Sequence, residues 1–220
     1  MYGLTPDRLL GNLMVVAICI PFHEWAHCFA AYLLGDTTPE QQGRLTLNPL
    51  VHIDPVGALA ILFTGFGWGR AARVNPHQMH RVANYRVGMA ITAFAGPFSN
   101  LILAVLFVLP FRLGWVSLPM ISDSGLMSPT ERLGMVLYWA MSINLALAVF
   151  NLLPIPPLDG SRILAGFAAP QIADFIERLE PVAPIILMVV LFILPQMGLD
   201  IVGWMVLPVQ GILTALLMGW

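Results

Sequence analysis

Long, almost uninterrupted runs of apolar residues recur along the chain and predict helices that cross a membrane. These runs lie at residues 9–35, 87–111, 133–153, 182–194 and 201–218. A helix needs about 20 mainly apolar residues to cross a bilayer, and the first three runs are long enough. The fourth run is shorter than this, so the number of spans after residue 180 stays open. We expect an α-helical polytopic membrane protein, built as a bundle of about four to six membrane helices.

Between the first two runs the pattern changes, because glycine, proline and arginine recur and no apolar run is long enough to span as a helix. Residues 44–48 alternate between polar and apolar side chains, as a short strand does. Residues 58–63 form a short apolar run that closely spaced glycines follow. We expect a small membrane-inserted β-sheet or re-entrant segment at about residues 43–75, within a single membrane-embedded domain over residues 1–220. Residues 161–180 predict an amphipathic helix near the membrane surface.

The composition supports a membrane location. Hydrophobic residues make up 58% of the chain and charged residues only 10%, whereas soluble domains contain about 25% charged residues. A soluble protein of this size could not bury so much apolar surface, so lipid must surround much of the chain. The net charge of -2 argues against a nucleic-acid partner, which would require a basic face.

The distribution of arginines predicts how the chain is oriented in the membrane. Cytoplasmic loops of membrane proteins carry an excess of lysine and arginine. If residues 36–86 are cytoplasmic, that side also carries most of the arginines, which favours an external N-terminus. The arginines on that side are Arg44, Arg70, Arg73, Arg81, Arg86, Arg162 and Arg178, and those on the other side are Arg8, Arg112 and Arg132.

His23, Glu24 and His27 form an H-E-x-x-H pattern within the first apolar run. Residues four apart share one face of a helix, so both imidazoles can reach one zinc ion. In this pattern the glutamate is the general base that takes a proton from a zinc-activated water. A charge near the middle of a bilayer costs at least ~2.5 kcal/mol, so a glutamate between two histidines there indicates a function. The alternative is a buried polar cluster that only packs helices.

A catalytic zinc ion also needs a third protein ligand and an open position. Asp159 is the first candidate, because it follows a proline-rich break after an apolar run, where irregular backbone must be buried or line a wet cavity. It could instead cap the helix that follows it. His52 and Asp54 are further candidates, although their place in a proline-rich loop also fits a polar turn. A late glutamate as ligand, Glu177 or Glu180, would indicate another kind of H-E-x-x-H protease.

Several longer motifs occur together, and their order along the chain is informative. They are His23-Glu24-Trp25-Ala26-His27, Gly43-Arg44-Leu45-Thr46-Leu47-Asn48-Pro49-Leu50, His52-Ile53-Asp54-Pro55, Gly67-Trp68, Val74-Asn75-Pro76, Ala95-Gly96-Pro97-Phe98-Ser99-Asn100, Asn151-Leu152-Leu153-Pro154 and Leu158-Asp159-Gly160. Together they resemble the site-2 protease family of intramembrane zinc metalloproteases, in its compact bacterial form without PDZ or CBS domains. The resemblance covers residues from about 9 to 165.

The resemblance implies that His23, His27 and Asp159 hold one Zn²⁺ ion per chain, with Glu24 as the catalytic base. The implied function is that of a zinc-dependent endopeptidase that cleaves transmembrane segments of membrane proteins within the lipid bilayer. The implied location is a bacterial cell membrane, with the active site nearer the cytoplasmic side. A non-catalytic zinc-binding membrane chaperone or sensor is the alternative, although the presence of Glu24 between the two histidines argues against it.

Four further side chains in the apolar runs could carry a function or could only pack. The resemblance implies that Asn151 lies near the site and steers the substrate or the scissile carbonyl. Asn100 is expected to bind substrate or to support a metal ligand. An asparagine on a membrane helix also often only hydrogen-bonds a neighbouring helix. Cys19 and Cys28 are interpreted as small apolar side chains, since a helix separates them by ~13 Å, too far for a disulfide.

Overall fold

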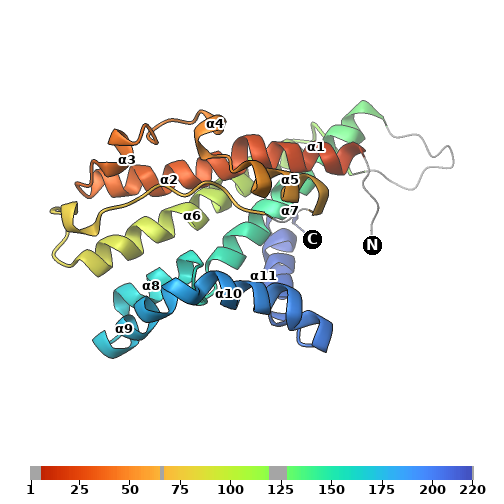
Figure 1. The fold of residues 1–220 in the computed structure, drawn as a ribbon. Helices are drawn as coiled ribbons and strands as arrows, with labels where there is room; N and C mark the ends of the chain where they lie inside the picture. The colour runs from red at the N-terminus through yellow and green to blue at the C-terminus, as the bar shows by residue number, and fades with distance from the viewer. Residues whose placement is uncertain (1–5, 65–66, 119–127, 220) are drawn as a thin grey trace.

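The computed structural model describes residues 6–64, 67–118 and 128–219, and this part of the chain is mostly helical (Figure 1). Five helices in it are long and apolar enough to cross a membrane, namely Leu9–Leu33, Tyr85–Arg112, Pro129–Asn151, Pro170–Met197 and Ile201–Met218. They match the five predicted runs, and the fourth is longer than its run because the helix already starts at Pro170. The chain is therefore a multi-pass helical membrane protein, as the apolar pattern predicted.

The first span is one continuous helix with a widened turn in its middle. Helix α1 (Pro6–Met14) passes into a π-helical turn, η1 (Val15–Cys19), and then into α2 (Ile20–Leu33). Pro21 has no amide hydrogen, and its ring would collide with a carbonyl of the preceding turn in a regular α-helix. The widened turn directly before Pro21 relieves this collision, and π-turns of this kind often occur beside functional sites.

Helices α2, α6 (Tyr85–Arg112) and α7 (Pro129–Asn151) form the centre of the bundle, and α6 packs against both of the others (Figure 1). Buried apolar side chains fill the spaces between them, including Leu103, Met141 and Leu145. Side chains in protein interiors are close-packed, and this packing fixes the relative positions of the helices. Helix α2 of this central group carries His23 and His27, two of the three residues that were predicted to bind metal.

The predicted β-sheet after the first span is wrong, because the described part of this segment holds short helices and no strand. The helices are α3 (Thr38–Gln41), α4 (Pro49–His52) and α5 (Pro55–Thr64). Residues 44–48, predicted as a strand, form an irregular connection with bends. Residues 58–63, predicted as part of this β-sheet or re-entrant segment, lie inside α5.

Local hydrogen bonds explain why this segment is helical. Asn48 and Asp54 each precede a proline that starts a helix, and their side-chain oxygens accept hydrogen bonds from amides of the first turn. Asn and Asp are favoured caps, and proline is favoured at the first helical position, so both signals start helices here. Within the described residues the remaining strand-like contact is an isolated antiparallel bridge between Ile53 and Gly69.

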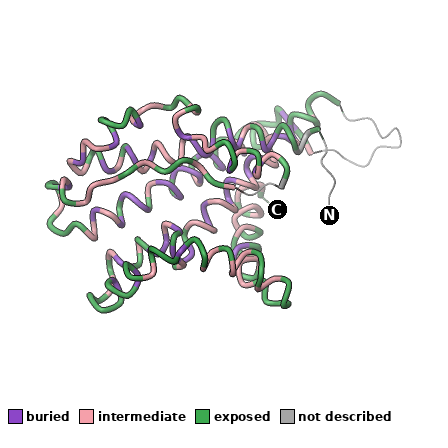
Figure 2. Tube along the Cα trace, in the orientation of Figure 1, coloured by how far each residue is buried: buried purple, intermediate pink, exposed green. Residues whose placement is uncertain are grey.

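Short helices and the last two spans follow the break at the end of α7. These elements are α8 (Asp159–Phe167), α9 (Pro170–Leu179), α10 (Ala183–Met188), the π-turn η4 (Val189–Ile193) and α11 (Ile201–Met218). The amphipathic helix predicted at 161–180 is thus two helices, because Pro170 cannot continue α8. The fourth and fifth spans bury few of their residues inside the protein (Figure 2), as helices that face lipid do.

Candidate active site

Three side chains that were predicted to bind zinc, from two distant parts of the chain, meet in the structure. His23 and His27 lie one turn apart on α2, and Asp159 is the first residue of α8. The Nε2 atoms of the two histidines are 3.0 Å apart, and each lies 3.4 Å from Oδ2 of Asp159. In the described part of the chain, this is the one group of His, Cys, Asp or Glu side chains that converges closely enough to hold a metal ion.

The spacing of these three atoms fits a tetrahedral zinc ion. Bonds of ~2.0–2.1 Å would place its ligand atoms ~3.3–3.4 Å apart, close to the observed separations. Oδ2 of Asp159 is buried without a hydrogen-bond partner, whereas a buried carboxylate oxygen normally has one. An anionic ligand with one unsatisfied oxygen is suited to a metal ion.

Both imidazoles are held at their outer nitrogens by α6. Nδ1 of His23 lies 2.5 Å from Oδ1 of Asn100, and Nδ1 of His27 lies 2.7 Å from the carbonyl oxygen of Thr92. Because both partners are acceptors, each Nδ1 carries the hydrogen and each Nε2 keeps a lone pair that points toward Asp159. Outer-nitrogen hydrogen bonds of this kind orient histidine ligands in metal sites. Asn100 therefore lies directly against the His23 ring.

Gly96 allows α6 to approach the two imidazoles. A β-carbon at this position would collide with the His27 ring and would lie 2.7 Å from Cε1 of His23. Gly69 has a similar role on the other side of α2, where a β-carbon would lie 2.9 Å from Oε1 of Glu24. Two glycines from different segments thus make room for the side chains of the H-E-x-x-H pattern.

A break in the helical structure places Asp159 opposite α2. Helix α7 ends at Asn151, and the proline-rich residues 154–157 prevent it from continuing. Helix α8 then starts at Asp159, and Leu158 occupies the N-cap position. The structure therefore does not support the alternative in which Asp159 caps this helix, because Leu158 is at that position and Asp159 faces the histidines.

The other candidates for the third ligand lie elsewhere. His52 is buried and donates from Nε2 to a backbone carbonyl at 2.7 Å, and Asp54 accepts from two amides in the first turn of α5. Glu177 pairs with Arg86 at 3.1 Å, and Glu180 pairs with an arginine of α8 at 3.4 Å. None of these side chains belongs to the converging group, whereas Asp159 does.

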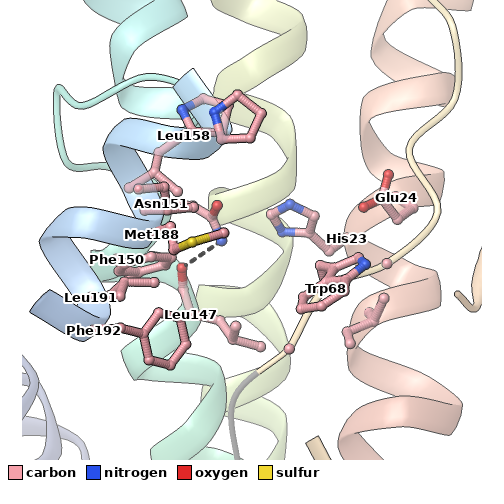
Figure 3. Close-up of a pocket in the computed structure, with 16 residues that line it drawn as sticks. His23, Glu24, Trp68, Leu147, Phe150, Asn151, Leu158, Met188, Leu191 and Phe192 are labelled. Carbon is pink, nitrogen blue, oxygen red and sulfur yellow. Dashed lines mark hydrogen bonds between the residues drawn. The ribbon is translucent and has the colours of Figure 1, made fainter. Parts of the chain in front are cut away.

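A pocket of about 680 Å³ lies beside His23 (Figure 3). His23 and Glu24 line it from α2, and Asn151 lines it from α7, where its Nδ2 donates to the carbonyl of Leu147 at 2.9 Å. Asn151 thus lies near the site, as expected. The remaining lining is mainly apolar and includes Trp68, Leu147, Phe150, Leu158, Met188, Leu191 and Phe192. The arrangement can hold a large apolar group next to the metal-binding atoms.

Two groups that hold the site together were not identified from the sequence. One is the backbone carbonyl of Thr92, which leaves no signal in the pattern of side chains. The other is Asn144, which is fully buried on α7 and accepts a hydrogen bond of 2.8 Å from Asn100. A polar residue within a membrane helix is itself a sign of function or of helix packing, so the position of Asn144 in the third apolar run was a usable signal.

Comparisons with known proteins identify the family of the chain. Residues 114–194 match the family described as Peptidase family M50. The chain is 37% identical over 187 residues to "Putative zinc metalloprotease YwhC" of Bacillus subtilis (strain 168), across 83% of this chain and 80% of that protein. It is also 34% identical over 163 residues to "Putative zinc metalloprotease Rip2" of Mycolicibacterium smegmatis, across 71% of this chain and 56% of that protein. No solved structure matches the chain.

The alignment with YwhC extends over most of both proteins, and so reaches well beyond the segment that matches the family. The family match itself covers Asn151 and Asp159. Membership of the family brings with it the expectation of zinc as the metal and of peptide hydrolysis as the reaction. On these grounds the chain belongs to peptidase family M50, the site-2 protease family of zinc metalloproteases.

Proposed function

We propose that this chain is a zinc-dependent intramembrane endopeptidase that cleaves transmembrane segments of other membrane proteins. The observation that carries the proposal is the convergence of His23, His27 and Asp159 beside a largely apolar pocket. Both histidines belong to the first membrane-spanning helix. A substrate would therefore meet these groups within the bilayer rather than in a soluble cleft.

One zinc ion per chain, held by His23, His27 and Asp159, would act as a Lewis acid toward the scissile carbonyl and the attacking water. Glu24 would take the proton from that water and deliver it to the leaving amine. Its position supports this role, since it follows His23 directly and lines the same pocket. Asn151, on the opposite wall, would hold the substrate backbone by a hydrogen bond from its amide.

The substrate must unwind locally before it can react. In a transmembrane helix each backbone carbonyl is already hydrogen-bonded within the helix, which shields it from attack. The described residues contain no sheet whose edge could receive the unwound segment. We therefore propose that apolar side chains of the pocket and the amide of Asn151 hold it instead.

The location is proposed from the arginine count together with the origin of the relatives. The relatives described above are bacterial, and the side with residues 36–86 carries most of the arginines. We propose that the chain is a single membrane-embedded domain over residues 1–220 in a bacterial cell membrane, with its active site nearer the cytoplasm.

A direct test uses the purified protein in lipid nanodiscs and a synthetic single-span substrate. Cleavage is expected within the apolar segment, should stop on addition of a zinc chelator, and should return when zinc is restored. A soluble unfolded protein serves as the second substrate and should be cleaved much more slowly. Metal binding without any cleavage would instead favour a zinc-binding chaperone or sensor. Cleavage that continues at the same rate in the presence of the chelator would contradict the proposed site.

A further inference from the structure

The His23 imidazole is connected to a buried amide on a third helix. Oδ1 of Asn100 on α6 lies 2.5 Å from Nδ1 of His23, and Nδ2 of Asn100 donates to Oδ1 of Asn144 on α7 at 2.8 Å. Nδ2 of Asn144 in turn donates to the carbonyl of Ala140 at 2.8 Å and to Sγ of Cys19. Both asparagines are fully buried, so water cannot replace these partners.

The direction of this chain of hydrogen bonds follows from its last member. The carbonyl of Ala140 can only accept, so the nitrogen of the Asn144 amide must face it. The oxygen of Asn144 must then face Asn100, which requires the nitrogen of Asn100 to point toward Asn144. The oxygen of Asn100 is consequently the atom that faces His23. A backbone carbonyl on α7 thus determines the orientation of two side-chain amides in sequence.

This orientation decides which nitrogen of His23 carries the hydrogen. An oxygen opposite Nδ1 requires a hydrogen on Nδ1 and leaves the lone pair on Nε2, the atom that faces His27 and Asp159. If the Asn100 amide were reversed, its NH₂ group would face Nδ1 and would favour a hydrogen on Nε2, which then could not bind a metal. His27 needs no such relay, because Nδ1 bonds a backbone carbonyl directly.

We propose that Asn144 is a positioning residue of the zinc site, which fixes the amide of Asn100 and through it the metal-binding tautomer of His23. This inference rests on the proposed zinc ligands His23, His27 and Asp159. Asn144 touches neither metal nor substrate, and it acts only through Asn100. Cys19 has a lesser part, because the carbonyl of Ala140 already accepts from the same nitrogen.

The test measures zinc affinity by competition with a chromophoric chelator, and measures the visible absorption of the Co²⁺-substituted protein. Asn144→Leu keeps a similar volume but removes the acceptor for Asn100, and it should weaken zinc binding ~10–100-fold, as loss of outer partners of metal ligands does. The Co²⁺ spectrum should change with it. Gln210→Leu is the matched control, because Gln210 on α11 bonds Ser142 on the same helix α7 away from the site, and its loss should leave affinity unchanged.

A second-site variant separates positioning from simple packing. Asn100→Asp presents two equivalent oxygens, so the group accepts from Nδ1 of His23 whichever way it is turned. In that background Asn144→Leu should no longer weaken zinc binding. If Asn144→Leu weakens binding equally in both backgrounds, or weakens it in neither, Asn144 does not act through the Asn100 amide. Should Asn144→Leu fail to fold, Asn144→Ala takes its place with the same expectations.

The same experiment distinguishes failure of this inference from failure of the proposed function. If the wild-type protein binds zinc and the Asn144→Leu variant binds it with the same affinity, the role of Asn144 alone is overturned. A wild-type protein that binds no zinc would overturn the proposed site, and the role of Asn144 with it. Thermal unfolding of each metal-free variant, measured alongside, shows whether a loss of affinity merely follows a loss of stability.

Discussion

Gly96 on α6 lies so close to His27 on α2 that a β-carbon on the glycine would overlap the imidazole ring. The contact joins the second membrane helix to the face of the first that carries His23 and His27. It also explains in physical terms why a helix interior, where glycine is ordinarily unfavourable, holds one at this position. The two histidine rings occupy the space that a side chain at this position of α6 would fill.

Gly96→Ala should therefore disrupt the zinc site. The added methyl group must displace the His27 ring, and we expect zinc affinity to fall by at least ~10-fold, with cleavage lost in proportion. Zinc content after dialysis against a graded zinc buffer measures the effect. Gly211→Ala is the matched control, because a β-carbon on Gly211 of α11 meets nothing within 4 Å. Equal zinc affinity in the two variants would show that the close approach of α6 does not matter to the site.

Glu24→Gln should separate chemistry from metal binding. The variant keeps the shape of the side chain but cannot take a proton, so we expect cleavage to fall by at least ~100-fold. Zinc content should stay at one ion per chain, because Glu24 is proposed as the base and not as a ligand. Glu40→Gln, on the exposed surface of α3, should change neither quantity. Substantial cleavage by Glu24→Gln would contradict the proposed mechanism.

Asp159→Ala tests the third ligand. Loss of its carboxylate should weaken zinc binding by at least ~10-fold and abolish cleavage. Asp54→Ala is the informative comparison, since Asp54 caps α5, and its loss should lower stability by ~0.5–2 kcal/mol while zinc remains bound. Isothermal titration of zinc into both variants, together with thermal unfolding, gives the two quantities. If Asp54→Ala loses zinc and Asp159→Ala does not, the assignment of the ligand is wrong.

Met188→Trp tests whether the apolar pocket receives substrate. Met188 lines the pocket from α10, and the larger ring should reduce the space next to His23 and Glu24. We expect KM to rise for single-span substrates with large apolar residues near the cleavage site, and to rise less for those with alanine or glycine there. Zinc binding should not change. Met197→Trp, at an exposed methionine outside the pocket, is the control, and identical KM values for both variants would argue that substrate binds elsewhere.

Much of this protein is determined by short-range features of the sequence. Apolar runs of sufficient length predicted the membrane helices, because a bilayer core sets a minimum length for a span. His23 and His27 were identifiable as a pair, because residues four apart on a helix share a face whatever the rest of the chain does. The break before Asp159 was predictable for a similar reason, since the clustered prolines cannot continue a helix.

The segment after the first span shows where short patterns mislead. The alternation at residues 44–48 predicted a strand, but a strand is stable only when a partner strand completes its hydrogen bonds. The structure instead satisfies this backbone locally, with Asn48 and Asp54 capping helices that start at prolines. Both caps could be recognised in the sequence. Their short-range hydrogen bonds stabilise helices more than an alternation of a few residues stabilises an unpaired strand.

Only the tertiary structure decided which distant groups meet. Asp54, His52 and Asp159 were all chemically suitable as a third ligand, and packing of α8 against α6 brought Asp159 alone to the histidines. The relay from Ala140 through Asn144 to Asn100 depends on the contact between α6 and α7, and its direction depends on a backbone carbonyl. Side-chain patterns along a chain carry no information about either, because interhelical contacts and carbonyl directions exist only once the helices have packed.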